Sequence, residues 1–216
     1  MVSVTELYDL SHTFAKDYLA SFAYPWEALP GIGALIERLG QSLSDDYRQV
    51  KPGVWVHESA TVAPTAYLGE NIIIGPDTEV RQGAFLRGNA LIGAGCVVGN
   101  STELKNAILF DGVQVPHYNY VGDSILGYKA HMGAGAITSN VKSNKSHVRV
   151  GDTQTGRKKV GAMLGDFAEI GCNSVLNPGT VVGRNSMVYP LSCVRGQIPA
   201  DSIYKTGGVI VPKEDG

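Results

Sequence analysis

Residues 56–104 read VHESATVAPTAYLGENIIIGPDTEVRQGAFLRGNALIGAGCVVGNSTEL. A branched aliphatic residue falls at every sixth position of this stretch, from Val56 to Leu104. A period of six fits neither an α-helix nor a simple alternating strand. It fits a solenoid in which each hexapeptide is one short strand and a corner, so that three of them close a triangular coil of about 18 residues. The sequence therefore predicts an all-β solenoid, a parallel β-helix of hexapeptide repeats with coils about 4.8 Å apart.

The repeat continues beyond this stretch but not without interruption. A second aliphatic series runs from Leu164 to Val194, and between the two series Leu109 and Leu126 each come one residue early. Two hexapeptides have thus become pentapeptides. Residues 141–160 break the period altogether with a polar, basic stretch. We interpret it as a loop inserted into the solenoid, where functional residues often lie; a merely solvated charged loop is the alternative.

The chain before the solenoid has helical spacing instead. Apolar residues recur at helical intervals in 5–22 and again in 32–43, with prolines between the two stretches. We expect a short N-terminal helical segment over 1–50, the β-helix over 51–198 and a C-terminal tail over 199–216. A solenoid end leaves an apolar cross-section open, so the helices are expected to cover an end or a side of the β-helix, or to pack on a neighbouring subunit.

Composition narrows the functional classes. The 216 residues carry a net charge of −2 and only 18% are charged, which argues against a nucleic-acid partner. The first 30 residues hold neither an apolar run of membrane-spanning length nor a signal-peptide pattern, so we expect a cytoplasmic protein without a membrane partner. Three cysteines without a CxxC pair do not form a disulfide framework. Among them, Cys96 occupies a small inward position of the repeat and is interpreted as a core residue.

A coil of about 18 residues brings distant residues into contact. Arg87 and Lys105 lie one coil apart, and two like charges at strand spacing repel each other. An anion between them would reverse the sign of this energy, and phosphate suits arginine and lysine. The pair therefore predicts a phosphate site. As a structural alternative, Glu103 or Asp123 supplies the neutralising charge.

His117 is the candidate for acid–base chemistry. It lies between Asn100 one coil earlier and Ala134 one coil later, which leaves room for a substrate. An imidazole that titrates near neutrality suits proton transfer from an ammonium group, although a solvated bystander is the alternative. The small residues 133–135 would let a ligand approach the backbone, whose N–H groups can stabilise an oxyanion.

These residues together resemble a known family, the acetyltransferase half of bacterial bifunctional N-acetylglucosamine-1-phosphate uridyltransferase/glucosamine-1-phosphate acetyltransferase. In that family the β-helix is left-handed, and the resemblance implies the same hand here. The matching strings are Leu-Arg at 86–87, Gly-Asn-x-x-Glu-x-Lys at 99–105, His-x-x-Tyr-x-Gly-Asp at 117–123, Gly-Ala-Gly-x-Ile-Thr-x-Asn at 133–140, Asn-Lys at 144–145 and Gly-Asp at 151–152.

The resemblance implies an acyl-CoA-dependent N-acyltransferase that acetylates an amino-sugar 1-phosphate, either glucosamine 1-phosphate or galactosamine 1-phosphate. It implies that His117 is the general base and that Glu103 orients it. The implied substrate-binding residues are Arg87, Lys105, Tyr120, His131, Asn140 and Lys145, and the implied acetyl-CoA-binding residues are Ala134, Asp166 and Arg184. It further implies acetyl-CoA as co-substrate, no metal, and a homotrimer whose active sites are shared between subunits.

The sequence departs from the family at several positions. The uridyltransferase domain is absent, so we expect no nucleotidyl transfer from this chain and a separate nucleotidyltransferase as a candidate partner. His131 replaces an asparagine of the sugar site, residues 141–143 differ from the family's string, and Asp166 replaces a serine near the thioester. Asp166 also lies one coil from Arg184, which predicts an ion pair.

Two other functional classes stay open. Carbonic anhydrases of the γ type share the hexapeptide solenoid but need three converging histidines for zinc. Here His57, His117, His131 and His147 lack a matching paired spacing. The other class is a non-catalytic sugar-phosphate or sugar-nucleotide binding protein, or a scaffold for a separate nucleotidyltransferase.

Overall fold

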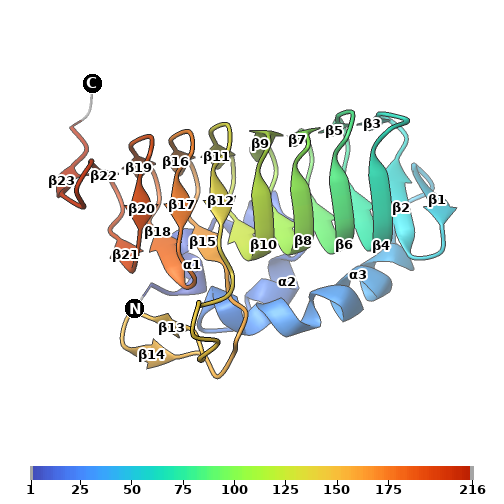
Figure 1. Ribbon diagram of the computed structural model, residues 1–216. Coiled ribbons are helices and arrows are strands. Elements are labelled where there is room, and N and C mark those ends of the chain that lie inside the picture. Colours follow the sequence, from blue (N-terminus) through green and yellow to red (C-terminus); the bar gives the residue numbers. More distant parts are fainter. Residues whose placement is uncertain (1, 215–216) are drawn as a thin grey trace.

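The computed structural model describes residues 2–214 and confirms the predicted fold class, a left-handed parallel β-helix with a short N-terminal helical segment (Figure 1). The aliphatic residues of successive coils pair in register, as Leu68 does with Leu86 and Leu86 with Leu104. Leu86 and Leu104 are fully buried. Stacked aliphatic residues therefore form one continuous core along the axis of the solenoid, as the six-residue period requires.

The triangular coil has three faces, and a 12-stranded sheet wraps around two of them. The first face holds the aliphatic positions of Leu68, Leu86 and Leu104, and the second face follows it after a corner in the same long strands. The strands of this sheet are β1 (Tyr47–Lys51), β2 (Val54–His57), β4 (Tyr67–Ile74), β6 (Phe85–Ile92), β8 (Glu103–Leu109), β10 (Tyr120–Leu126), β12 (Ile137–Thr138), β15 (Ala162–Leu164), β17 (Val175–Leu176), β18 (Thr180–Val182), β20 (Cys193–Val194) and β21 (Gln197–Ile198).

The third face is a separate nine-stranded sheet. Its strands are β3 (Thr61–Val62), β5 (Glu79–Val80), β7 (Val97–Asn100), β9 (Gln114–His117), β11 (His131–Met132), β16 (Glu169–Ile170), β19 (Met187–Val188), β22 (Ser202–Tyr204) and β23 (Ile210–Pro212). Strand β22 pairs in parallel with β19 and then antiparallel with β23. Part of the expected C-terminal tail thus extends this sheet, and Tyr204 of the tail pairs with Val188.

The two pentapeptides shorten two coils by one residue each. Leu104 pairs with Val121 and Val121 with Thr138, so the inward positions stay aligned despite the deletions. Beyond Thr138 the pairing partner is Leu176, and residues between β12 and β15 leave the solenoid. This insertion forms a small hairpin of β13 (Arg149–Val150) and β14 (Thr153–Gln154).

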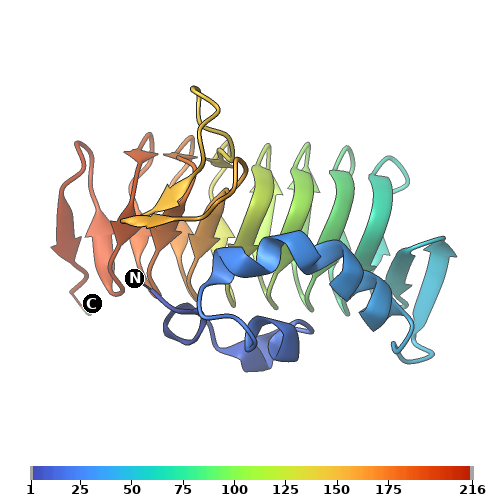
Figure 2. The same ribbon diagram turned by 90° about the horizontal axis from the view of Figure 1, so that it is seen from below.

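Short helices between Val4 and Gly40 run along the second face (Figure 2). They are α1 (Val4–Leu7), η1 (Leu10–His12), α2 (Lys16–Leu19), η2 (Pro25–Gly31) and α3 (Ile32–Gly40). We expected these helices to cover an end or a side of the β-helix or to pack on a neighbouring subunit, and in the structure they cover a side. The helical spacing in 5–22 does not give one continuous helix. The Asp9 side chain accepts a hydrogen bond from the Ser11 N–H at 3.0 Å, a local bond that competes with helical pairing.

The corner between the first and second faces repeats one backbone conformation. Asn71, Asn89, Asn106 and Asp123 follow one another there with φ of 51°, 50°, 51° and 47°. Asparagine and aspartate tolerate this left-handed region better than other non-glycine residues, which explains their choice. Asn140 takes the next place, and the chain leaves for the insertion from it.

Candidate functional site

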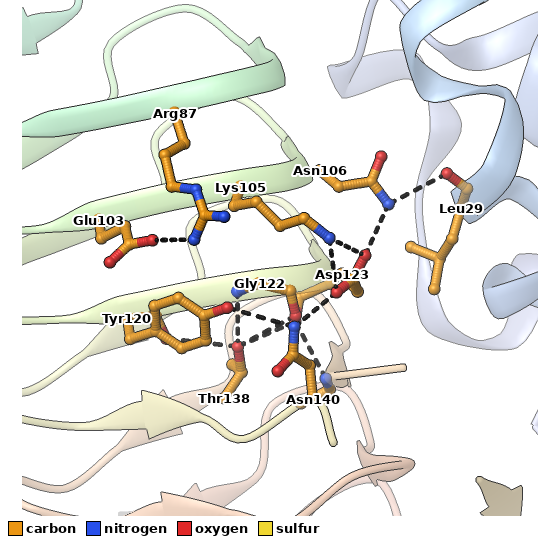
Figure 3. Close-up of polar contacts among 12 residues, drawn as sticks. Leu29, Arg87, Glu103, Lys105, Asn106, Tyr120, Gly122, Asp123, Thr138 and Asn140 are labelled. Atoms are coloured by element: carbon orange, nitrogen blue, oxygen red, sulfur yellow. Dashed lines mark hydrogen bonds and ion pairs between the residues drawn. The ribbon is translucent and has the colours of Figure 1, made fainter. Parts of the chain in front are cut away.

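Asp123 is the centre of a polar cluster at this corner (Figure 3). Its side chain is almost buried, with 6% of its surface exposed. Its carboxylate accepts hydrogen bonds from Lys105 Nζ at 2.8 and 3.0 Å and from Asn106 Nδ2 at 2.9 Å, and a further short one from Asn140 Nδ2. A buried carboxylate is tolerated only with such compensation. Asp123 therefore fixes the positions of two predicted substrate-binding residues, Lys105 and Asn140.

Tyr120 joins this cluster through Asn140. The Asn140 amide donates to the Tyr120 hydroxyl at 3.2 Å, and Tyr120 lies beside Glu103 across the β8–β10 pair. Burial raises the pKa of the Tyr120 phenol, and the nearby charges of Glu103 and Asp123 raise it further. The hydroxyl therefore keeps its proton at neutral pH and can donate it to a ligand.

The predicted stacking of Arg87 on Lys105 is wrong. Leu86 pairs with Leu104, but Gly88, not Arg87, is opposite Lys105, because the register shifts by one residue between Leu86 and Gly88. This bulge absorbs the residue missing from the shorter coil. Each cation has its own carboxylate, as the structural alternative anticipated: Arg87 Nη1 lies 2.8 Å from Glu103 Oε1, and Lys105 pairs with Asp123.

Arg87 and Lys105 nevertheless share one cavity. It has a volume of about 330 Å³ and lies at the same corner, where a ligand can reach both cations. Its lining comprises Glu70, Asn71, Arg87, Gly88, Asn89 and Lys105.

His117 lies at a different corner, the one between the third and first faces. It is exposed, and within residues 2–214 its imidazole makes no hydrogen bond or ion pair. The expected contact with Glu103 is therefore absent from the chain, because the Glu103 carboxylate binds Arg87 instead. The backbone carbonyl of His117 accepts the Gly135 N–H at 3.0 Å, which places Ala134 beside His117 as predicted.

Asn119 holds this corner together, and sequence reasoning missed it. The residue is 2% exposed. Its Nδ2 donates to the carbonyls of Gly133 at 2.8 Å and Ala136 at 3.0 Å, and its Oδ1 accepts the His117 N–H at 3.1 Å. The amide thus ties the His117 corner to the glycine corner of the next coil. The signal in the sequence is an asparagine at a corner of the repeat, since a buried amide at a strand corner requires hydrogen-bond partners on adjacent coils.

Two further predicted site residues lie apart from this cluster. His131 is on the third face, where its Nδ1 lies 2.8 Å from Glu169 Oε2. Lys145 is exposed in the insertion, with φ of 57° and its N–H bonded to the Lys142 carbonyl at 2.9 Å. One chain therefore does not bring them to Tyr120.

Asp166 and Arg184 form the predicted ion pair, but it lies under the N-terminal segment. Asp166 is fully buried, and its carboxylate also accepts the N–H groups of Asp9 at 2.7 Å and Tyr128 at 2.8 Å. These contacts make Asp166 an attachment point for residues 7–9, and its burial leaves no carboxylate surface for acetyl-CoA.

The described part of the chain was predicted to hold no metal site and to bury one cysteine, Cys96. Residues 2–214 contain no group of three or more histidine, cysteine, aspartate or glutamate side chains that could hold a metal ion. Burial raises the pKa of the Cys96 thiol to about 12, so it is a packing residue, as its inward repeat position predicted. No helix in this part of the chain is long and apolar enough to cross a membrane.

Comparison with known proteins supports the resemblance to the bifunctional family. A bifunctional sugar-1-phosphate nucleotidylyltransferase/acetyltransferase of Sulfurisphaera tokodaii is 26% identical over 93% of this chain and 54% of its own. The bifunctional protein GlmU of Methanococcus maripaludis is 27% identical over 92% of this chain and 50% of its own. The chain thus spans about half the length of these curated relatives.

A solved structure and a family model also match this chain. The structure of a UDP-N-acetylglucosamine acyltransferase from Francisella novicida is 16% identical, with a TM-score of 0.43, and the match covers 74% of this chain and 67% of that one. The model of the GMPPB C-terminal domain matches residues 76–198, more than half of the chain and nearly all of the regular coils. The chain therefore belongs to the GMPPB C-terminal domain family.

Proposed function

We propose that this protein is an acyl-CoA-dependent N-acyltransferase that acetylates an amino-sugar 1-phosphate, with glucosamine 1-phosphate the first candidate and galactosamine 1-phosphate the second. The observation that carries the proposal is the His117 corner, where an exposed imidazole without a partner in residues 2–214 lies beside the glycine corner around Ala134. The relatives named as nucleotidylyltransferase/acetyltransferase and as GlmU support it.

In this reaction the sugar amine attacks the thioester carbonyl, and His117 accepts the proton that the nitrogen loses. A C–N bond forms, the C–S bond breaks, and the departing sulfur takes up a proton. The Ala134 N–H makes no hydrogen bond within residues 2–214 and is free to donate to the developing oxyanion. His117 and Ala134 thus have complementary roles at one corner.

The acceptor would lie along the first face, between the His117 corner and the Asp123 cluster. Its phosphate would enter the cavity of Arg87 and Lys105, where it shares the two cations with Glu103 and Asp123. The Tyr120 hydroxyl and the Asn140 amide would contact sugar hydroxyls. In this arrangement the Glu103 carboxylate positions the Arg87 guanidinium and does not orient His117.

The active unit would be a homotrimer, in which a neighbouring subunit completes each site. His131 on the third face and Lys145 in the insertion lie away from Tyr120 in their own chain, as expected of residues that serve a neighbour's site. A separate nucleotidyltransferase would use the acetylated product.

The test is a thiol-release assay with acetyl-CoA and each amino-sugar 1-phosphate. We expect release with at least one of them, and a loss of about 100-fold or more in kcat for His117→Ala. His57→Ala is the matched control, because His57 is also a histidine, ends strand β2 near the start of the β-helix and has no proposed role. Wild-type protein that releases no thiol, or a His117→Ala variant with undiminished release, would exclude this mechanism.

A further inference from the structure

A second cavity lies where the insertion returns to the β-helix, between the insertion and the N-terminal segment. Its volume is about 390 Å³. We call it the basic recess, and its lining comprises Leu29, Pro30, Asn106, Asp123, Gly156, Arg157, Lys158 and Lys159. In Figure 2 the insertion lies next to the N-terminal helices, and Leu29 and Pro30 of η2 form the other wall of the recess. The proposed function gives this cavity no role.

The recess has an excess of positive charge. Within residues 2–214, no carboxylate lies within ion-pair distance of Arg157, Lys158 or Lys159, and their side-chain nitrogens make no hydrogen bonds. Its one lining carboxylate, Asp123, is 6% exposed and already accepts from Lys105, Asn106 and Asn140. Three neighbouring cations without a counter-charge repel one another, so an anion would stabilise the recess.

The backbone that carries these three cations is joined to the β-helix. Val141 and Lys159 form an antiparallel bridge, the Val160 N–H donates to Asn140, and the Gly161 N–H donates to Asp123 O at 2.7 Å. Val160 is fully buried. The base of the insertion is therefore part of the folded β-helix, and the three residues have fixed backbone positions along one wall of the recess.

We propose that the basic recess binds a phosphate ester. Guanidinium and ammonium groups match phosphate oxygens in charge and geometry, and the volume of the recess exceeds that of one phosphoryl group. The Lys105–Asp123 pair separates the recess from the cavity of Arg87 and Lys105, so the site is additional to the one predicted from the sequence. The proposed function assigns the single phosphate of the acceptor to the cavity of Arg87 and Lys105, so the phosphate in the recess would belong to the acyl-CoA. Only this assignment rests on the proposed function.

Calorimetric titration with inorganic phosphate at constant ionic strength tests the site itself. The variant Lys158→Gln/Lys159→Gln removes two lining cations. The control Lys16→Gln/Arg48→Gln removes the same charge from exposed positions outside the recess. We expect the phosphate Kd to rise about tenfold or more in the recess variant and less than about twofold in the control. Equal changes in the two variants, or no phosphate binding by the wild type, would overturn the proposal.

The same variants identify the source of the phosphate. The titration is repeated with glucosamine 1-phosphate and with adenosine 3′,5′-bisphosphate, the nucleotide portion of coenzyme A. A rise in Kd confined to the second compound supports the acyl donor. A rise confined to the first would place the acceptor's phosphate in the recess and refute its assignment to the cavity of Arg87 and Lys105. No rise for either compound would refute a role for the recess in binding these substrates. Because none of these titrations requires turnover, a failed thiol-release assay refutes the proposed function separately.

Discussion

The polar cluster around Asp123 makes the most demanding prediction. Asp123→Asn keeps the shape of the side chain but removes its charge, so Lys105 loses its counter-ion and two amide donors, Asn106 and Asn140, lose carboxylate acceptors. Breaking a buried ion pair at one partner costs about 3–5 kcal/mol. Because the Lys105 side chain is 25% exposed and can reach water, we expect a loss of about 2–3 kcal/mol. For a chain of this length, that loss lowers Tm by about 5–10 °C.

Thermal unfolding followed by circular dichroism measures this shift. Asp77→Asn is a matched control, since Asp77 has the same left-handed conformation, with φ of 54°, but is exposed and makes no side-chain hydrogen bond within residues 2–214. We expect the control to change stability by less than about 0.5 kcal/mol. A Tm for Asp123→Asn within about 2 °C of the control would refute the claim that this carboxylate organises the cluster.

Three shorter predictions concern other buried groups. Burial raises the pKa of Tyr47 to about 12, so its phenol should ionise above the ordinary value of 10.0 in a spectrophotometric titration. Because the unfolded chain loses this proton first, the free energy of unfolding should fall as the pH rises from about 10 to about 12. The Tyr47→Phe variant should lack this part of the pH dependence. A thiol reagent should modify Cys172 and Cys193 in the native protein but leave Cys96 unmodified until the protein unfolds; early reaction of Cys96 would contradict its burial. Asp166→Asn should speed amide hydrogen exchange in residues 4–12 well before exchange in the β-helix, and uniform exchange would show that the carboxylate does not anchor this segment.

The sequence was sufficient for the coils because one physical constraint acts on every sixth residue. Leu86, Leu104 and Val121 must fill the same core, so they pair in register even where the coil loses a residue and the spacing falls from 18 to 17 residues. The same logic located the insertion, whose residues have no inward position to fill. Asp166 and Arg184 were paired correctly because both lie on regular coils one repeat apart.

The contacts of Arg87 could not be predicted by counting coils. The pentapeptide after Leu104 leaves β8 one residue shorter than β6, and the extra residue of β6 must be accommodated somewhere along the pair. The spacing of the aliphatic residues does not show at which position of β6 the extra residue is accommodated. The bulge falls at Arg87 and removes the register on which the stacking argument relied. A register error of one residue changes the predicted neighbours of an outward-facing side chain, because core packing does not fix the position of that side chain.

The N-terminal segment bears on where a shared site can form. It covers the corner between the first and second faces, where Asn106 donates to the Leu29 carbonyl at 3.2 Å. It also covers the corner between the second and third faces, where His12 stacks on Tyr128 with 3.7 Å between ring centroids. The third corner carries His117 and the 66% exposed Tyr118. A second copy of the chain can therefore approach the first and third faces most closely at the corner of His117, where the proposed reaction needs a neighbour.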